Sequence, residues 1–176
     1  DFVRYFRVHS GPWSAAGSRW PQAMDRTISR GEIVVVDAIG AFQGYGFDVN
    51  RTIASGNLDE RARALCETVL EATASAVNAC VAGNTISDVA AAAREVILAS
   101  PFADGLGASM GHGLGMETVE LPYVMAGDET PLEAGMTLCI EPGLFFPGWA
   151  GAAIEQKVIT QPDGPPEIIT ADIPMR

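Results

Sequence analysis

GEIVVVDAIGAFQGYGFDVNRTI, residues 31–53, is the stretch that decides the fold class. Two β-rich runs, Ile33–Val36 and Val49–Ile53, flank a turn at residues 44–46 that contains two glycines. A glycine-rich turn between two such runs is typical of a hairpin, and an uninterrupted apolar run is typical of a buried strand. The stretch therefore predicts a β-hairpin whose first strand is buried.

Outward from this hairpin, the pattern changes to helices and then back to strands. Residues 59–81 carry apolar side chains at intervals of three and four, and Gly83 ends this helix. A second helix is predicted from a cap at Ser87 to a stop before Pro101. Short apolar runs then predict strands at 111–115, 136–140, 144–146 and 154–159. This order indicates an α+β domain with one curved sheet covered by helices.

Composition limits the function classes. The chain has 176 residues, 48% of them apolar, and its net charge is 11 − 22 = −11, which argues against a nucleic-acid partner. We find neither an apolar run of the ~20 residues that span a bilayer nor a signal peptide. Three widely spaced cysteines form no disulfide or CxxC pattern, so we expect a cytoplasmic protein. The chain opens with an apolar, strand-like stretch, and we therefore expect a fragment of a longer chain.

Two aspartates frame the hairpin. Asp37 ends the most apolar strand, where a buried carboxylate requires a cation, and Asp48 follows 48 − 37 = 11 residues later across the turn. A hairpin of this length can bring both carboxylates to one place. Taken alone, the pair fits slightly better with two loop-end residues that cap backbone NH groups.

Three further residues extend this set. His112 lies between glycines, Glu141 follows the apolar run 136–140, and Glu155 lies within the apolar run that ends at Ile159. Each could be an ordinary turn residue or an outward-facing residue of a half-exposed strand. Together, four carboxylates and one imidazole suit two divalent cations, because charges of −4 and +4 then cancel.

The motifs that contain these residues resemble the pita-bread metallopeptidase family, which includes methionine aminopeptidase, aminopeptidase P, prolidase and creatinase. The intervals 11, 64, 29 and 14 between the five candidate ligands are most similar to those of the prolidase and aminopeptidase P branch. The resemblance covers nearly the whole chain, and it rests on Val36-Asp37, residues 44–52, residues 111–115, residues 135–143 and Ile154-Glu155.

This resemblance implies a fold, a cofactor and a reaction. It implies a curved, mostly antiparallel pita-bread catalytic domain over residues 1–176, without the first helix pair of the family and with an exposed apolar patch in its place. It implies two divalent ions (Mn, Co, Zn or Fe), with Asp37 on one, Asp48 and Glu155 bridging, and His112 and Glu141 on the other. A metal-bridging hydroxide would attack an amide carbonyl of a small or short-peptide substrate, with Glu141 as the proton shuttle. A homodimer is also expected.

The sequence departs from the peptidase pattern at two positions. Trp20 and Val119 stand where peptidases of the family keep histidines that contact the substrate, and His9 is the only histidine available as a substitute. An aminopeptidase P-like arginine is also replaced, by Ala153. Since each lost oxyanion donor typically costs ~10²–10³ in rate, we expect weak Xaa-Pro peptidase activity. Trp20 and Val119 are predicted to form an apolar wall of the substrate pocket near the metals, although Trp20 could simply fill space.

Two other function classes remain open. A dimethylsulfoniopropionate lyase resembles this family, keeps the acidic ligands and lacks the peptidase histidines. Some relatives have lost their ligands and act as metal-free interaction proteins, but all five ligand positions are intact here. Cys139 has no histidine beside it in sequence and is predicted to be a core residue.

Overall fold

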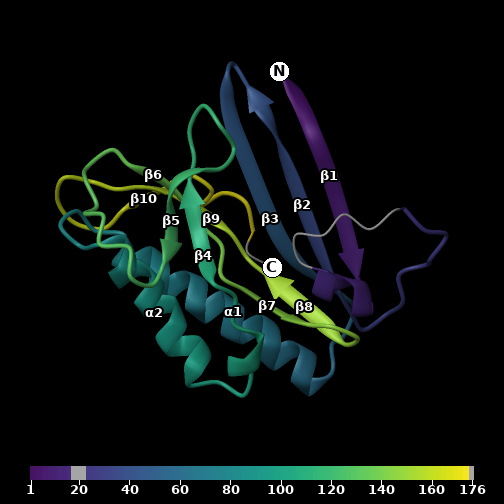
Figure 1. Cartoon of the computed structure of the whole chain (residues 1–176). Helices are drawn as coiled ribbons and strands as arrows, with labels where there is room; N and C mark the ends of the chain where they lie inside the picture. The colour runs from purple at the N-terminus through teal and green to yellow at the C-terminus, as the bar shows by residue number, and fades with distance from the viewer. Residues whose placement is uncertain (17–22, 175–176) are drawn as a thin grey trace.

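The computed structural model describes residues 1–16 and 23–174 of the chain (Figure 1). The strands β1 (Phe2–Ser10), β2 (Glu32–Phe42) and β3 (Tyr45–Ser55) form an antiparallel sheet in the order β1-β2-β3. The predicted hairpin is confirmed, but its turn consists of Gln43 and Gly44, with φ of 51° and 86°. A two-residue turn with both residues at positive φ matches the twist of the strands, so Tyr45 already belongs to β3.

Two helices follow the hairpin and lie side by side along the sheets (Figure 1). Helix α1 (Glu60–Ala79) begins at the cap Asp59, and α2 (Ile86–Leu98) begins at the cap Thr85. The prediction that Ser87 caps α2 is therefore wrong. Thr85 and Asp88 satisfy each other's backbone NH groups in a capping box, which places Ser87 inside the first turn.

The remaining strands complete an antiparallel α+β fold, as predicted, but hydrogen bonding divides them into separate sheets. A five-stranded sheet has the order β10-β9-β6-β4-β5, and β7 pairs with β8. Leu65, Val69 and Ile97 of the helices and Leu138 and Ile140 of the five-stranded sheet belong to one buried core. The other elements are η1 (Gly11–Ala16), η2 (Ala103–Gly105), β4 (Ser109–Gly113), β5 (Glu120–Met125), β6 (Thr137–Ile140), β7 (Gly143–Phe146), β8 (Ala150–Ala153), β9 (Gln156–Ile159) and β10 (Glu167–Ile168).

An apolar patch is exposed on the face of the first sheet that points away from the core. Phe6, Val8 and Ile53 are 65%, 48% and 47% exposed, and the strand register places all three on that face. That this patch occupies the place of the family's first helix pair stays a prediction. Among the described residues, no helix is both long and apolar enough to cross a membrane.

Candidate metal centre

The hairpin supplies the first part of the site. Asp37 pairs with Asn50 in the register of β2 and β3, and Asp48 lies two residues from Asn50. Because strand side chains alternate, Asp37, Asn50 and Asp48 project from the same face, with the two carboxylates on a diagonal. All three side chains are buried. The alternation of side chains along the two strands therefore brings both carboxylates to one face of the hairpin, as the spacing of 11 residues predicted.

Arg7 is the cation that buried Asp37 requires. It lies opposite Asp37 in the register of β1 and β2, and its Nη2 forms an ion pair with Asp37 Oδ2. From the sequence, a metal ion was the expected source of this neutralising charge. In the structure, a side chain of the neighbouring strand already neutralises Asp37.

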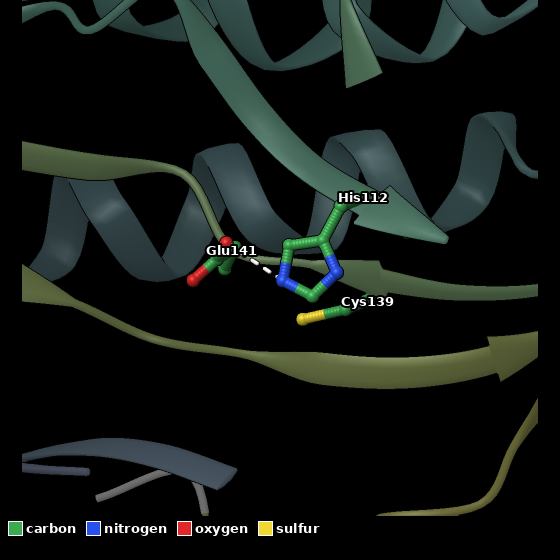
Figure 2. A group of neighbouring side chains, drawn as sticks. All are labelled: His112, Cys139 and Glu141. Carbon is green, nitrogen blue, oxygen red and sulfur yellow. Dashed lines mark ion pairs between the residues drawn. The ribbon is translucent and has the colours of Figure 1, made fainter. Parts of the chain in front are cut away.

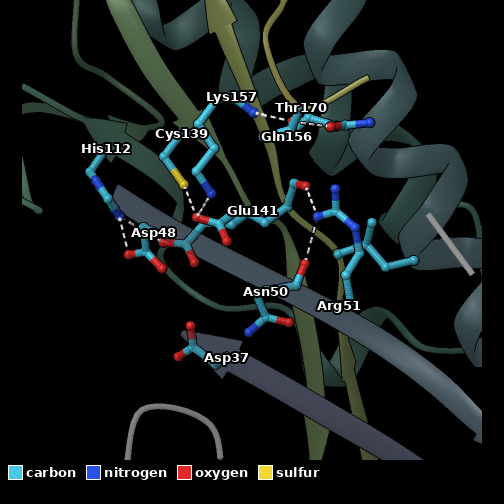
Figure 3. A network of polar contacts seen from close by, with 12 residues as sticks. Asp37, Asp48, Asn50, Arg51, His112, Cys139, Glu141, Gln156, Lys157 and Thr170 are labelled. Atoms are coloured by element: carbon cyan, nitrogen blue, oxygen red, sulfur yellow. Dashed lines mark hydrogen bonds and ion pairs between the residues drawn. The ribbon is translucent and has the colours of Figure 1, made fainter. Parts of the chain in front are cut away.

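The five-stranded sheet supplies the second part. His112 pairs with Cys139, and Cys139 pairs with Lys157, so these three side chains project from one face of β4, β6 and β9. Glu141 follows Cys139 by two residues, and Glu155 precedes Lys157 by two residues. Figure 3 shows Asp48, His112, Cys139, Glu141 and Lys157 converging on one place between the two sheets.

His112 is oriented toward the carboxylates. Its Nδ1 lies 2.8 Å from the carbonyl oxygen of Gly113, to which it donates, and its Nε2 faces Glu141 Oε1 at 3.3 Å and Asp48 Oδ2 at 3.9 Å. One ligand atom each from His112, Cys139 and Glu141 lie within 4.8 Å of one another (Figure 2). A backbone bond on one ring nitrogen typically leaves the other nitrogen free to bind a metal.

The surroundings of Asp48, Glu141 and His112 shift the pKa of each side chain. Burial, followed by the charge of Glu155, raises the pKa of Asp48 to about 8. Burial also raises the pKa of Glu141, against the effect of its hydrogen bond with His112. Burial works to lower the pKa of His112, but the hydrogen bond and the charge of Glu141 outweigh it and the pKa rises. Burial, more than repulsion between the carboxylates, is thus the cause of both raised carboxyl pKa values.

The raised pKa of Asp48 predicts that the metal-free protein loses stability as the pH rises. This pKa is about 8 in the folded chain against an ordinary value of 3.8, so the folded state binds more protons between these values. Asp48 therefore stabilises the fold fully below pH 3.8, its ordinary pKa, and this contribution is lost as the pH rises through its folded pKa of about 8.

Melting temperatures of the chelator-treated protein provide the measurement for this pH effect. Between about pH 5.5 and about pH 8.5 we expect a fall on the order of 5 °C more than in the Asp48→Asn variant. Equal falls in both proteins would contradict the prediction.

Several buried acceptors of the cluster have no protein partner. Among the described residues, Asp37 Oδ1, Asn50 Oδ1 and Glu155 Oε2 are buried oxygens without a hydrogen bond. Buried polar atoms are normally satisfied, and oxygen ligands with one imidazole suit a divalent cation. The donor set around His112 and Glu141 therefore fits a metal ion.

A cavity of about 460 Å³ opens beside this cluster. Glu141 and Asp37 form part of its wall, and the side chain of Glu141 is 33% exposed, whereas Glu155 is fully buried. His9 also lines the cavity, and burial followed by the charge of Arg7 lowers its pKa. Apolar walls come from other residues of the lining, which include Ala15, Ala16, Val35, Phe145 and Ala153.

Of the two predicted substrate-pocket residues, the structure describes only Val119. Val119 is 45% exposed in the loop between β4 and β5, and the described residues that line the cavity do not include it. Its role in a substrate pocket stays a prediction. Trp20 falls outside the described residues. The described part of the cavity wall instead offers Phe145 as an aromatic side chain.

Two residues of this site were not among the candidates predicted from the sequence, and a third was expected only to belong to the core. Arg7 and Lys157 each form an ion pair with a candidate ligand, and Cys139, predicted to be a core residue, donates its thiol hydrogen to Glu155 Oε1. Lys157 follows Glu155 by two residues, just before the apolar pair Val158 and Ile159, and in an extended segment this spacing places both side chains on one face. This alternation was a signal in the sequence that could have identified it.

Gly111 is needed to seat His112 against β6. Its φ is 148°, and an added Cβ would lie 2.0 Å from the carbonyl oxygen of Cys139. We expect Gly111→Ala to lower the free energy of unfolding by about 2–3 kcal/mol, because β4 must move away from β6. Gly107→Ala is the control, since its nearest atom would be 3.9 Å away. Chemical denaturation measures both variants, and equal losses would contradict the prediction.

An antiparallel α+β fold with an acidic, histidine-containing cluster between its sheets is typical of the pita-bread metallopeptidase class. The model of metallopeptidase family M24 matches residues 6–162, and the chain belongs to this family. It is 39% identical to an Xaa-Pro dipeptidase of Pyrococcus furiosus over 142 residues, which are 81% of this chain and 41% of the relative.

Solved structures show the same fold. An X-Pro aminopeptidase from Thermotoga maritima has a TM-score of 0.90 at 29% identity, covering 99% of this chain and 49% of that protein. A dipeptidase PepE from Mycobacterium ulcerans has a TM-score of 0.88 at 37% identity, covering 94% and 44%. The chain thus spans less than half the length of these relatives.

Proposed function

We propose that the full-length protein that contains this chain is a metal-dependent hydrolase that cleaves the peptide bond of a short peptide of the Xaa-Pro type. The observation that carries this proposal is that Asp48 and Glu141 both face His112 Nε2, at 3.9 Å and 3.3 Å, beside a cavity of about 460 Å³. A cavity of this volume is within the usual range for small-molecule sites. The printed names of the relatives, Xaa-Pro dipeptidase and X-Pro aminopeptidase, support the substrate class.

The residues of the cluster have distinct tasks in this proposal. Asp48, His112, Glu141 and Glu155 would hold a divalent ion, of which manganese suits a carboxylate-rich set. Such an ion supplies a water molecule of lowered pKa and polarises the scissile carbonyl. Glu141 contacts His112 and also reaches the cavity, so it is placed to take a proton from water and return it to the leaving amine.

His9 is the described residue best placed to contact the substrate as a histidine. It lies on β1 in the cavity wall, and its lowered pKa favours a neutral imidazole. A neutral imidazole can donate one hydrogen bond to an oxygen of the substrate. We therefore propose that His9 takes over the substrate contact of a family histidine. The two positions of those histidines are occupied by Trp20 and Val119 in this sequence.

The test is a kinetic assay of the full-length protein. We expect amine release from Xaa-Pro dipeptides only after Mn²⁺ is added to chelator-treated protein, and a His9→Ala variant slower by about 10²-fold. Val119→His is the matched gain-of-donor variant. Its failure to raise turnover, together with loss of turnover in His9→Ala, supports His9 as the donor.

Other outcomes would contradict the proposal. A protein that binds no Mn²⁺ and releases no amine from a dipeptide panel is not this hydrolase. Release of a volatile sulfide from dimethylsulfoniopropionate, without dipeptide cleavage, would instead identify lyase chemistry on the same cluster.

A further inference from the structure

Lys157 is a buried cation inside the acidic cluster. Its side chain is 3% exposed, and its Nζ lies 2.5 Å from Glu155 Oε1, whose side chain is fully buried. The strand register aligns Lys157 with Cys139 and His112, so the lysine reaches the cluster from the same sheet face (Figure 3). A lysine side chain is rarely this buried without a charged partner, and Glu155 is that partner.

The charges of the cluster balance with one dication. Asp37, Asp48, Glu141 and Glu155 contribute −4, while Arg7 and Lys157 contribute +2 through their ion pairs with Asp37 and Glu155. The remaining −2 is cancelled by the +2 charge of a single divalent ion. Two divalent ions would leave an excess of +2 in a buried place, or +1 with a bridging hydroxide, and either excess is costly.

The contacts of Glu155 also indicate that the cluster binds one divalent ion. Its Oε1 accepts from the thiol of Cys139 and contacts Lys157 Nζ at 2.5 Å, which leaves Oε2 as the unpartnered oxygen. A metal bound at Oε1 would need ~2.0–2.2 Å on the same oxygen, where the ammonium already lies. On the other side, His112 Nε2 faces Asp48 and Glu141 within 3.9 Å.

We propose that the ammonium of Lys157 takes the place of a second metal ion, so that the site binds one divalent ion per chain. Asp48, His112 and Glu141 hold this ion, and Glu155 Oε2 is available to it. This inference rests on the proposed function only in requiring that the cluster binds metal. The family resemblance implies two divalent ions in this site. In this chain, one ion and the ammonium of Lys157 would take their places.

Metal counting on the full-length protein tests the inference. We expect chelator-treated wild-type protein to take up one equivalent of Mn²⁺ by calorimetric titration and elemental analysis. Lys157→Met, which removes the charge at similar length, should take up two equivalents. Lys157→Arg is the matched control that keeps the charge and should stay at one.

Electron paramagnetic resonance of the Mn²⁺-loaded proteins gives a second readout. The wild-type protein should show the six-line signal of an isolated ion, and Lys157→Met should show the exchange-coupled signal of an ion pair. If Lys157→Met does not fold, Lys157→Gln replaces it, and the wild-type count and signal still decide between one ion and two.

The outcomes separate this inference from the proposed function. Two equivalents or a coupled signal in the wild-type protein would overturn the role of Lys157 and leave the proposed hydrolase intact. One equivalent in both Lys157→Met and the wild-type protein would have the same meaning. No bound Mn²⁺ in any of these proteins would overturn both.

Discussion

Replacing Glu141 by glutamine is expected to lower kcat by about 10²–10⁴-fold while the protein stays folded. Glu141 is the candidate ligand that combines a contact with His112, at 3.3 Å, with a partly exposed side chain in the cavity wall. Burial is the main cause of the raised pKa of Glu141 in the metal-free chain. Glutamine keeps the shape and one oxygen but cannot carry that proton.

Steady-state kinetics on an Xaa-Pro dipeptide measure this effect. Glu129→Gln is the matched control, since Glu129 is an exposed carboxylate on the loop after β5. A Glu141→Gln variant with turnover within a few-fold of the control would remove Glu141 from the proton-transfer role. Metal content should be measured on the same samples, so that loss of the ion is distinguished from loss of the proton carrier.

Replacing Asp48 by asparagine is expected to change stability in opposite directions with and without metal. In the metal-free protein, the buried Asp48 carboxylate is opposed by burial and by the charge of Glu155, so its removal should raise the melting temperature above neutral pH. With Mn²⁺, the variant lacks a charged ligand, and we expect its affinity to fall by at least about 100-fold, or about 2.8 kcal/mol.

Thermal melts with and without Mn²⁺ provide the measurement for Asp48→Asn. In the wild-type protein, Mn²⁺ at 100 times the Kd should raise the free energy of unfolding by about 2.7 kcal/mol and raise the melting temperature accordingly. In the variant, the same Mn²⁺ concentration should give almost no stabilisation. Asp25→Asn, at an exposed position before β2, is the control. An unchanged Mn²⁺ shift in Asp48→Asn would show that Asp48 does not bind the ion.

The sequence by itself determined the local elements and the kinds of ligand. The run 31–53 specified a hairpin because apolar residues and a glycine turn leave few other conformations, and the helical stripes specified α1 and α2. The even alternation of strands also determined that Asp37 and Asp48 share a face, once the turn was fixed. Small local features were less certain, because Ser87 and Thr85 are both good caps and only the reciprocal bond with Asp88 decides between them.

The tertiary structure alone decided which charges meet. Arg7 and Asp37 are 30 residues apart and pair because β1 aligns with β2, and the approach of the first sheet to the second brings Asp48 to His112, 64 residues later. Alternation places Glu155 and Lys157 on one face, but only burial of that face between the two sheets makes the lysine a neutralising cation rather than a solvated one. Electrostatic energies depend on burial and distance between strands, and neither is specified by spacing along the chain. The number of positive charges in the cluster is therefore a property of the packed fold.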